Sequence, residues 1–369
     1  MSRVSRRSLL TLAAVAALPA ACSRQSPETS ALPTPAGSPS ASLAPPASPA
    51  ASASAVSSLG PAATVTASPS ASASASATAS KNAKVARDTG RGGPVSPATG
   101  KVMLGAYLSL SGRSASESLA LRRSQLGRDQ RIVHQFWAWD EAMPRTRSNV
   151  PSSSTLMISW HGVAWNKING GASDKLIAAA ARNLAAQGKP LLVRWAWEMN
   201  GDWFEWGGAS NGKNADGYVS AWRRIHGIFA DEGADNVSWV WSPNWNSSPG
   251  DAWNKMQRYY PGDDYVDWVG VSGYNFYKES PATLFNPIVN AYGAKKPIIV
   301  TETAAIDFGG TTKADWTDDL AAYARRTPEL SAIVWFDTDT HNDTNFRIDS
   351  TTASLAAYRR MAANSHFQG

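Results

Sequence analysis

The segment Pro190–Asn200 reads PLLVRWAWEMN, an apolar run that ends at a glutamate, Glu198. Seven other apolar runs lie between residues 101 and 340, and helix-compatible stretches separate them. Continuous apolar runs are typical of strands covered on both faces, and their alternation with helices indicates parallel β/α units. The eight runs are Val102–Leu110, Ile132–Trp139, Thr155–Trp160, Pro190–Trp197, Val237–Trp241, Tyr265–Val271, Pro297–Thr301 and Ala332–Phe336. Helical patterns include Asp174–Gln187, Ala215–Asp231, Lys313–Arg326 and Thr351–Ala363.

Eight such units predict an α/β fold that consists of a single (β/α)8 TIM barrel. An open doubly wound sheet is the alternative, but no G-x-G-x-x-G motif follows the first run. We expect three segments along the chain. They are an export signal over residues 1–22, a disordered linker over residues 23–100 and the barrel domain over residues 101–369.

The charge distribution argues against a nucleic-acid partner. The chain of 369 residues carries 35 Lys and Arg against 29 Asp and Glu, a formal excess of +6. Residues 1–100 hold eight basic and two acidic side chains, so they account for the whole excess and the barrel segment is neutral. A nucleic-acid protein needs its positive charge on the folded surface. We therefore expect no nucleic-acid partner. Separately, we expect the protein to be a monomer.

The Cys and His content argues against several classes of site. A single Cys excludes a disulfide within the chain and a zinc site built on cysteines, and the five His contain no H-x-x-x-H pair. The loop with Asp337, Asp339 and Asp343 lacks the glycine and terminal glutamate of an EF-hand, so we interpret it as a solvated loop. We expect neither a metal nor a cofactor.

The first 22 residues read MSRVSRRSLLTLAAVAALPAAC and resemble a twin-arginine export signal. Cys22 follows two alanines, which resembles the cleavage site of a bacterial lipoprotein, where the cysteine receives a lipid anchor. Pro19 stands where leucine is usual, and ordinary cleavage without a lipid is the alternative. We expect an exported protein that is secreted or lipid-anchored on the outer face of the cell membrane. The linker after Cys22 is rich in Ala, Ser, Pro and Thr and is too poor in large apolar residues to fold.

Two glutamates are the candidate catalytic residues. Barrel enzymes place their chemistry at the carboxyl ends of strands, where Glu198 ends the fourth run and Glu302 the seventh. Hydrolysis of a glycoside needs one carboxyl group that protonates the leaving oxygen and another that meets the charge developing at the anomeric carbon. From the residues alone, the alternative is that each glutamate pairs with an arginine such as Arg194 at the surface.

The surroundings of the two glutamates predict different roles. Tryptophans surround Glu198 in the sequence, and desolvation raises the pKa of a carboxyl group, which suits a proton donor. Thr301 and Thr303 flank Glu302 and offer hydroxyl donors to a carboxylate.

The segment from Arg194 to Gly207, RWAWEMNGDWFEWG, resembles the signature of glycoside hydrolase family 26, chiefly endo-β-1,4-mannanases on a clan A (β/α)8 barrel. The resemblance implies that Glu198 is the acid/base and Glu302 the nucleophile. It also implies that Trp203 lines the sugar site, that Tyr274 interacts with the nucleophile and that Trp335 forms the floor under the sugar.

The predicted activity is that of an exported retaining endo-β-glycanase acting on β-1,4-mannan-type polysaccharide. One residue departs from the family pattern: Trp197 stands where many family mannanases have a histidine before the acid/base. Mixed-linkage β-glucan and β-1,3-xylan therefore remain as alternative substrates. A polysaccharide-binding protein of the cell surface without hydrolytic activity is the alternative of a different class.

Further candidate substrate contacts lie near the strand ends. His134 and His161 are candidates for bonds to sugar hydroxyls, with packing inside the barrel as the alternative. Tryptophans at strand ends offer broad apolar faces to pyranose rings, with burial in the core as the alternative. The candidates for substrate binding are Trp203, Tyr274, Trp335, His161, His134, Trp197, Asn200 and Trp245.

Overall fold

Eight parallel strands close into a barrel, because β1 pairs with β2 on one side and with β8 on the other. The computed structural model describes residues 92–341 and 344–368, which fall in one compact unit. The strand order around the barrel follows the chain, and the short β9 pairs with the start of β1. This arrangement confirms the predicted TIM barrel. The strands are β1 (Val102–Ser109), β2 (Ile132–Trp137), β3 (Thr155–Trp160), β4 (Leu191–Trp195), β5 (Val237–Trp241), β6 (Trp268–Ser272), β7 (Ile298–Thr303), β8 (Leu330–Thr338) and β9 (Phe367–Gln368).

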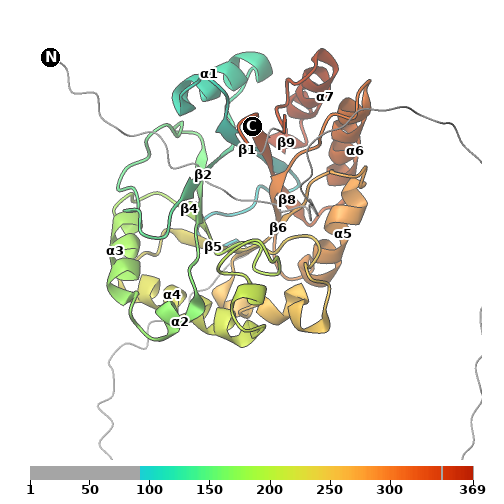
Figure 1. Ribbon diagram of the computed structural model, residues 1–369. Coiled ribbons are helices and arrows are strands. Elements are labelled where there is room, and N and C mark those ends of the chain that lie inside the picture. The colour runs from blue at the N-terminus through green and yellow to red at the C-terminus, as the bar shows by residue number, and fades with distance from the viewer. Residues whose placement is uncertain (1–91, 342–343, 369) are drawn as a thin grey trace, which may run out of the picture. The chain divides into compact units, whose positions relative to one another are not determined.

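Helices surround the barrel, but two of the eight units have no α-helix (Figure 1). The connection from β2 to β3 is irregular, and the connection after β5 contains only short 3-10 turns. The α-helices are α1 (Ala115–Leu126), α2 (Trp165–Asn169), α3 (Asp174–Ala185), α4 (Ala215–Asp231), α5 (Pro281–Tyr292), α6 (Thr312–Arg326) and α7 (Thr352–Ala363). The 3-10 turns are η1 (Gly208–Ser210), η2 (Ala252–Asn254), η3 (Met256–Tyr259) and η4 (Asp263–Tyr265).

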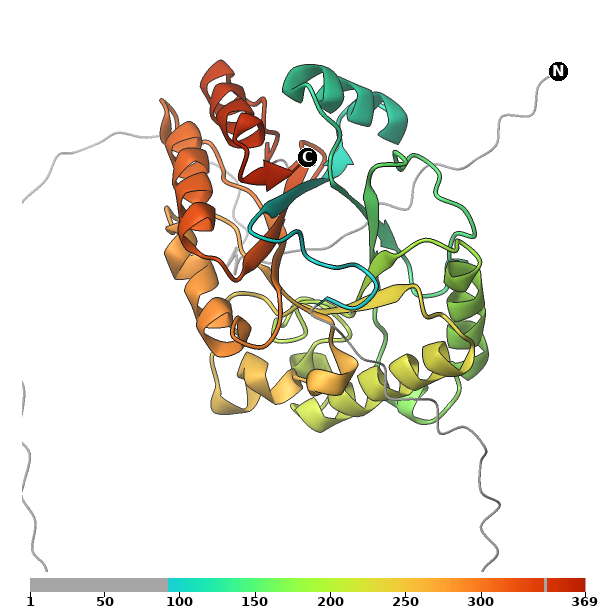
Figure 2. The same ribbon diagram turned by 180° about the vertical axis from the view of Figure 1, so that it is seen from behind.

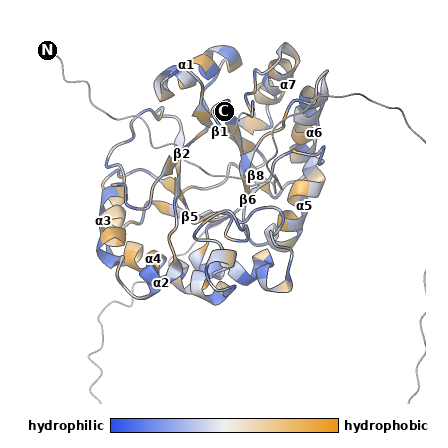
Figure 3. Cartoon of the chain, viewed as in Figure 1, coloured by the Kyte–Doolittle hydropathy of each residue, from blue (hydrophilic) through white to orange (hydrophobic). Residues whose placement is uncertain are grey.

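Apolar side chains form two cores, one inside the barrel and one between the strands and the helices. Helices such as α3 turn an apolar stripe toward the strands and a polar face outward (Figure 3). Removal of these surfaces from water is the main source of stability for such a layered fold. The core inside the barrel contains Met103, Ile132, Met157, Leu192, Val240, Trp268, Ile299, Ala332 and Val334.

The amino end of the barrel is sealed by residues that precede β1. Val95 is buried in the inner core, and its backbone N–H donates to the Ser238 hydroxyl at 2.8 Å. The carbonyl of Gly92 accepts from the Trp268 indole at 2.9 Å. Figure 2 shows this first described stretch crossing the opening of the barrel. The predicted linker boundary at residue 100 is therefore wrong by several residues, because one buried valine and a few backbone bonds fold a segment of linker-like composition.

The predicted export signal over residues 1–22, the anchor at Cys22 and the predicted linker up to residue 91 lie outside the described residues. Within residues 92–341 and 344–368, no helix is long and apolar enough to cross a membrane.

Candidate active site

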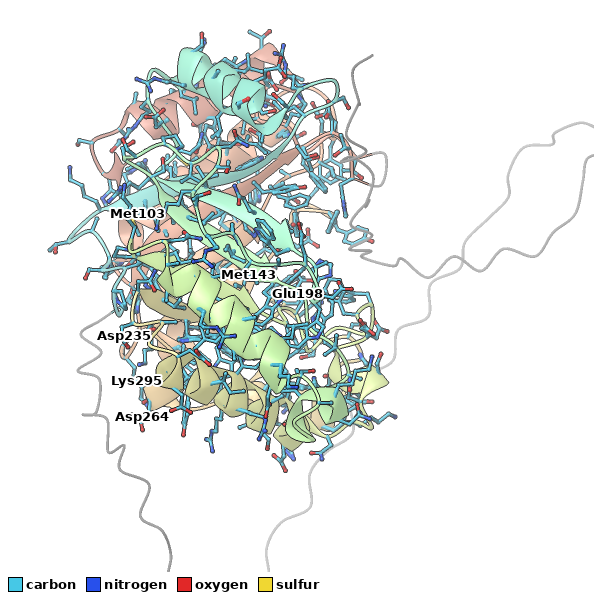
Figure 4. The ribbon with its side chains drawn as sticks, turned by 90° about the vertical axis from the view of Figure 1, so that its left-hand side faces the viewer. Met103, Met143, Glu198, Asp235, Asp264 and Lys295 are labelled. Atoms are coloured by element: carbon cyan, nitrogen blue, oxygen red, sulfur yellow. The ribbon has the colours of Figure 1, made fainter. Side chains whose placement is uncertain are left out.

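The two glutamates lie at the carboxyl end of the barrel. Figure 4 shows Glu198 at the end opposite Met103 at the start of β1 and Asp235 before β5. Only 8% of Glu198 and 5% of Glu302 is exposed, so both carboxyl groups lie in a largely desolvated site. Burial of two acidic groups side by side is costly unless each has partners, and the partners define the site.

Glu302 lies within β7 and points into the barrel because the strand is irregular there. The pairing register shifts between Val300 and Thr303 on one side of β7, and next to Ser272 on the other. Thr301 and Glu302 consequently both reach side chains of other barrel strands, which strict alternation along a strand does not allow. Irregularities of this kind re-aim a side chain, and here they aim the candidate nucleophile.

Both oxygens of Glu302 accept hydrogen bonds. Oε1 accepts from Nη1 of Arg194 in a buried ion pair, and Oε2 accepts from the Tyr274 hydroxyl at 2.6 Å. Burial, followed by the negative charges of Glu302 and Glu198, raises the pKa of Tyr274 well above its ordinary value, so the phenol keeps its proton and donates. Both donors complement a negative charge on Glu302. The predicted contact between Tyr274 and Glu302 is present in the structure.

Glu198 lies beyond the end of β4 in a tight turn. Ala196 and Glu198 both have left-handed backbone, with φ of 43° and 53°. Such a conformation is unfavourable for non-glycine residues and occurs mainly where the surroundings require it. The backbone N–H of Glu198 donates to the carbonyl of Ser242 at 2.8 Å, which fixes the turn to the chain after β5. A side chain at Gly201 would lie 2.4 Å from the Trp203 ring, which explains the glycine of the E-M-N-G motif.

One arginine and one serine connect the two carboxyl groups. Arg194 donates from Nη1 to Glu302 and from Nη2 to the Ser272 hydroxyl at 2.5 Å. Ser272 also lies near Glu198, where its hydroxyl lowers the pKa of that carboxyl group. The Trp203 indole N–H donates to Oε2 of Glu198 at 2.9 Å. The two glutamates, more than 100 positions apart in the sequence, therefore belong to one electrostatically coupled cluster.

The electrostatics of this cluster differ between the two glutamates. Burial, followed by the negative charge of Glu302, raises the pKa of Glu198 from 4.5 to about 7. The positive charge of Arg194 and the bonds from Ser272 and Trp203 oppose this rise. Glu198 thus holds a proton near neutral pH beside a carboxylate that has a cationic partner.

His134 supports the cluster from inside the barrel. Its Nε2 lies 2.7 Å from the Ser159 hydroxyl, which accepts from Arg194 at 3.2 Å. Burial, followed by the charge of Arg194, lowers the pKa of His134 well below its ordinary value. The neutral ring of His134 and the Ser159 hydroxyl share one hydrogen bond, and Ser159 connects the histidine to Arg194. The predicted sugar contact for His134 does not fit this buried position.

His161 and Trp197 pack against each other with ring centres 5.3 Å apart. Trp197 is 1% exposed, and the guanidinium of Arg194 lies 5.2 Å from its ring centre. The predicted direct substrate contact by Trp197 is therefore wrong, because the left-handed Ala196 turns its ring into the core. His161 is half-buried at the end of β3, and burial lowers its pKa.

Another predicted substrate contact, Trp335, lies outside the barrel. The Trp335 indole packs between β8 and the rings of Trp316 and Tyr358, and it donates to the carbonyl of Phe346 at 2.8 Å. Its prediction as the sugar floor is wrong, because alternation along β8 turns this side chain toward α6 and α7.

Asn200 is buried with its amide occupied by the backbone of the neighbouring loop. Its Oδ1 accepts from the N–H of Asn244 at 2.8 Å, and its Nδ2 donates to the carbonyls of Asn244 and Asn246. Asn200 therefore ties the loop after β4 to the loop after β5, and its predicted substrate contact is wrong. The half-buried Trp245 lies at the end of β5, and its backbone N–H donates to the carbonyl of Ser272 at 2.8 Å.

Several aromatic residues at the site were missed by the sequence analysis. Phe336, next to Trp335, points into the barrel and stacks on Tyr107 with ring centres 4.8 Å apart. Phe136 and His341 contact the same ring of Phe336. A cavity of about 360 Å³ lies between β2, α1 and the loop after β2, where Tyr107 and Phe136 form part of its lining, and it does not include Glu198 or Glu302. Its volume falls in the range of small-ligand pockets. Side chains alternate between the two faces of a strand. Counting in steps of two from the residues inside the barrel would therefore have identified these inward positions.

Asp337 was predicted to lie in a solvated loop, but it is buried near the end of β8. This carboxylate is 1% exposed and accepts from Nε and Nη2 of Arg122 at 2.6 and 2.8 Å. Arg122 also bonds Asp349, which ties α1 to the loop that precedes α7. Among the described residues, no group of three or more His, Cys, Asp and Glu side chains is placed to hold a metal ion.

A parallel barrel with two buried glutamates at the ends of its fourth and seventh strands is typical of glycoside hydrolases. The family model for glycosyl hydrolase family 26 matches residues 135–354. This match covers more than half of the chain and spans both glutamates, and the chain belongs to glycosyl hydrolase family 26.

The names of known relatives refer to different polymers. Endoglucanase H of Acetivibrio thermocellus is 33% identical over 267 residues, which are 67% of this chain and 29% of that protein. A mannan endo-1,4-beta-mannosidase of Bacillus subtilis is 34% identical over 103 residues, which are 27% of each chain. The match to each of these relatives thus spans less than a third of its length. The solved family 26 β-mannanase from Bacteroides ovatus has the same fold, with a TM-score of 0.55, 19% identity and coverage of 73% of this chain and 90% of that chain.

Proposed function

We propose that this protein is a retaining endo-β-glycanase that cleaves its polysaccharide by double displacement. One observation carries the proposal: the charge of Glu302 helps to raise the pKa of the buried Glu198 to about 7, and Glu302 itself accepts from Arg194 and Tyr274. Glycosidases of the retaining type need such a pair, one group as proton donor and the other as nucleophile.

In the first step, a Glu302 oxygen forms a bond to the anomeric carbon as the glycosidic C–O bond breaks. The proton of Glu198 moves to the departing oxygen, so the leaving sugar departs as an alcohol. In the second step, a water molecule gives a proton to Glu198, and its oxygen bonds the anomeric carbon and releases Glu302. Tyr274 and Arg194 hold Glu302 in place for attack, and the Trp203 indole orients Glu198.

We infer that a β-glucan, with mixed-linkage glucan as the model polymer, is preferred over β-1,4-mannan. Trp197 occupies the position of the histidine of many family mannanases, and it is buried, so that contact to substrate is lost. Endoglucanase H matches two thirds of the chain, which supports a glucan substrate. β-1,4-Mannan is the second candidate, supported by the Bacillus subtilis mannosidase.

Release of reducing sugar from lichenan, galactomannan and β-1,3-xylan tests this proposal, with Glu302→Ala as the inactive control. We expect the fastest release from lichenan, a rapid fall in viscosity that marks endo action, and products that first carry the β-anomer. Binding of a polymer without release by the unaltered chain would instead identify a non-hydrolytic polysaccharide-binding protein.

We also propose that the protein is exported and anchored through Cys22, since the first 22 residues resemble a lipoprotein signal. The mass of the amino-terminal peptide of the mature protein tests this. A peptide that begins at a lipid-modified Cys22 supports the anchor, and an unmodified terminus elsewhere contradicts it.

A further inference from the structure

Two large apolar side chains are well exposed in residues 92–341 and 344–368, and both follow strands of the active site. Tyr277, in the loop after β6, is 68% exposed, and Phe308, in the loop after β7, is 38% exposed. Single exposed apolar residues need no explanation, but a pair on one functional face indicates a binding surface. We call Tyr277 and Phe308 the rim pair.

The two loops of the rim pair run side by side. Asn275 and Ala305 form a parallel bridge, and the N–H of Ile306 donates to the carbonyl of Asn275 at 3.3 Å. Farther along, Nζ of Lys278 lies 5.6 Å from the ring centre of Phe308. The rim pair therefore lies on adjacent segments, and the residue after Tyr277 contacts the ring of Phe308.

The backbone that carries Tyr277 is held through Glu279. The N–H of Tyr277 donates to the Glu279 carboxylate at 2.7 Å, and the indole of Trp316 in α6 donates to the carbonyl of Glu279 at 2.7 Å. Backbone held by such bonds loses little conformational freedom when a ligand binds to the ring that it carries. The exposure of Tyr277 is thus a feature of an ordered loop.

A line of aromatic rings connects the rim pair to the candidate nucleophile. Tyr274 donates to Glu302, the ring centres of Tyr274 and Phe276 are 5.4 Å apart, and those of Phe276 and Tyr277 are 6.4 Å apart. This series of contacts leads from the carboxylates outward to the exposed ring of Tyr277. A surface built from aromatic rings beside polar groups suits sugars, whose pyranose rings have apolar faces and hydroxyl edges.

We propose that the rim pair is a distal subsite that binds sugar units of the polysaccharide beyond those at Glu198 and Glu302. This inference rests on the proposed function. It predicts that the enzyme prefers long chains, because only a chain that extends over the loops after β6 and β7 reaches both rings.

Gel electrophoresis through lichenan, galactomannan or β-1,3-xylan tests binding without hydrolysis when all proteins carry Glu302→Gln. We expect at least one polymer to retard the parent protein, and Tyr277→Ala with Phe308→Ala to reduce that retardation clearly. Tyr277→Phe keeps the ring and is expected to preserve it. Lys295→Ala at the opposite end of the barrel (Figure 4) is the control for a surface change. Equal migration of the parent and the double variant in every polymer would overturn the proposal.

Kinetics on the active chain give a second readout. For the polymer that the chain cleaves, we expect Tyr277→Ala to lower kcat/KM by about 2- to 12-fold on a long chain. The loss on the matching trisaccharide is expected to be smaller, which general damage to the fold would not produce. Absence of cleavage by the unaltered chain refutes the proposed function, whereas equal losses on both substrates refute the distal subsite alone.

Discussion

The ends of β4 and β7 each present a glutamate, but the protein holds the two side chains in different ways. Glu302 remains inside its strand, and an arginine and a tyrosine bond both of its oxygens. Glu198 lies past the end of its strand on left-handed backbone, with a pKa of about 7. The comparison shows how one barrel end surrounds two carboxyl groups differently: one has a cationic partner, and the other has a raised pKa.

The replacement Glu302→Ala is the strongest way to break this comparison. Without a nucleophile, double displacement has no covalent step, and we expect kcat to fall by about 10⁴- to 10⁶-fold. Reducing-sugar release from the preferred polymer measures the loss, and circular dichroism checks the fold. Activity above about one per cent would place the nucleophile elsewhere.

Glu198→Ala is expected to lower kcat by about 10²- to 10⁴-fold on a natural polysaccharide, because the leaving oxygen then receives no proton. The same variant is expected to form the glycosyl-enzyme readily from a dinitrophenyl glycoside, whose leaving group needs no proton. A burst of dinitrophenolate followed by slow turnover measures this difference. Equal impairment with both leaving groups would contradict the acid role.

Arg194→Met removes the charge that is shared by the two halves of the comparison. The buried Glu302 would lose its cationic partner, and we expect the free energy of unfolding at pH 7 to fall by about 3–5 kcal/mol. Denaturant unfolding measures the change. Arg182→Met, which breaks an exposed pair with Glu232, is the matched control and should have little effect. Addition of Glu302→Gln to Arg194→Met should restore part of the loss, and no recovery would argue against a charge effect.

Trp203→Phe sharpens the comparison because it removes the hydrogen bond to Glu198 and keeps an aromatic ring at this position. This bond lowers the pKa of Glu198, so its loss should raise that pKa further above about 7. A proton donor works below its pKa, so the alkaline limb of the kcat/KM profile should move to higher pH. At the optimum we expect a loss of less than about 10-fold. An alkaline limb that moves to lower pH would show that Glu198 is not the group that titrates there.

The smallest expected effect is a change in thermal stability caused by Glu198→Gln. A buried carboxyl group with a raised pKa favours the folded state below pH 4.5, and this contribution is lost as pH rises through about 7. Glutamine does not titrate, so only the parent loses this contribution as the pH rises. The melting temperature of the variant minus that of the parent should therefore increase by about a few degrees between pH 4.5 and 7. Thermal scans across this range measure it, and a constant difference would contradict the raised pKa.

The regular parts of the fold were predictable because they follow from local patterns. The eight apolar runs match the eight barrel strands, and the helical pattern Ala215–Asp231 has the bounds of α4. The absence of α-helices after β2 and β5 was not predicted, since the length of a connection says little about its form. The folded segment around Val95, which seals the amino end of the barrel, was not predicted because its composition resembles that of the linker.

Side-chain direction was harder to predict than position. Trp335 and Phe336 are neighbours in the sequence, and one packs under helices while the other faces the site. Asn200 belongs to a motif that suggests substrate contact, yet loop backbone occupies its amide. Both errors arise because composition does not say which face of a strand or loop meets its neighbours.

The amino-acid sequence alone determined the barrel class, the positions of Glu198 and Glu302 at two strand ends and the expectation that their surroundings differ. The tertiary structure decided how they act together. The irregular register of β7, the left-handed turn after β4 and the bonds from Arg194 and Ser272 bring the two carboxyl groups into one cluster. These features depend on contacts between strands far apart in the chain, and no local pattern of residues encodes such contacts.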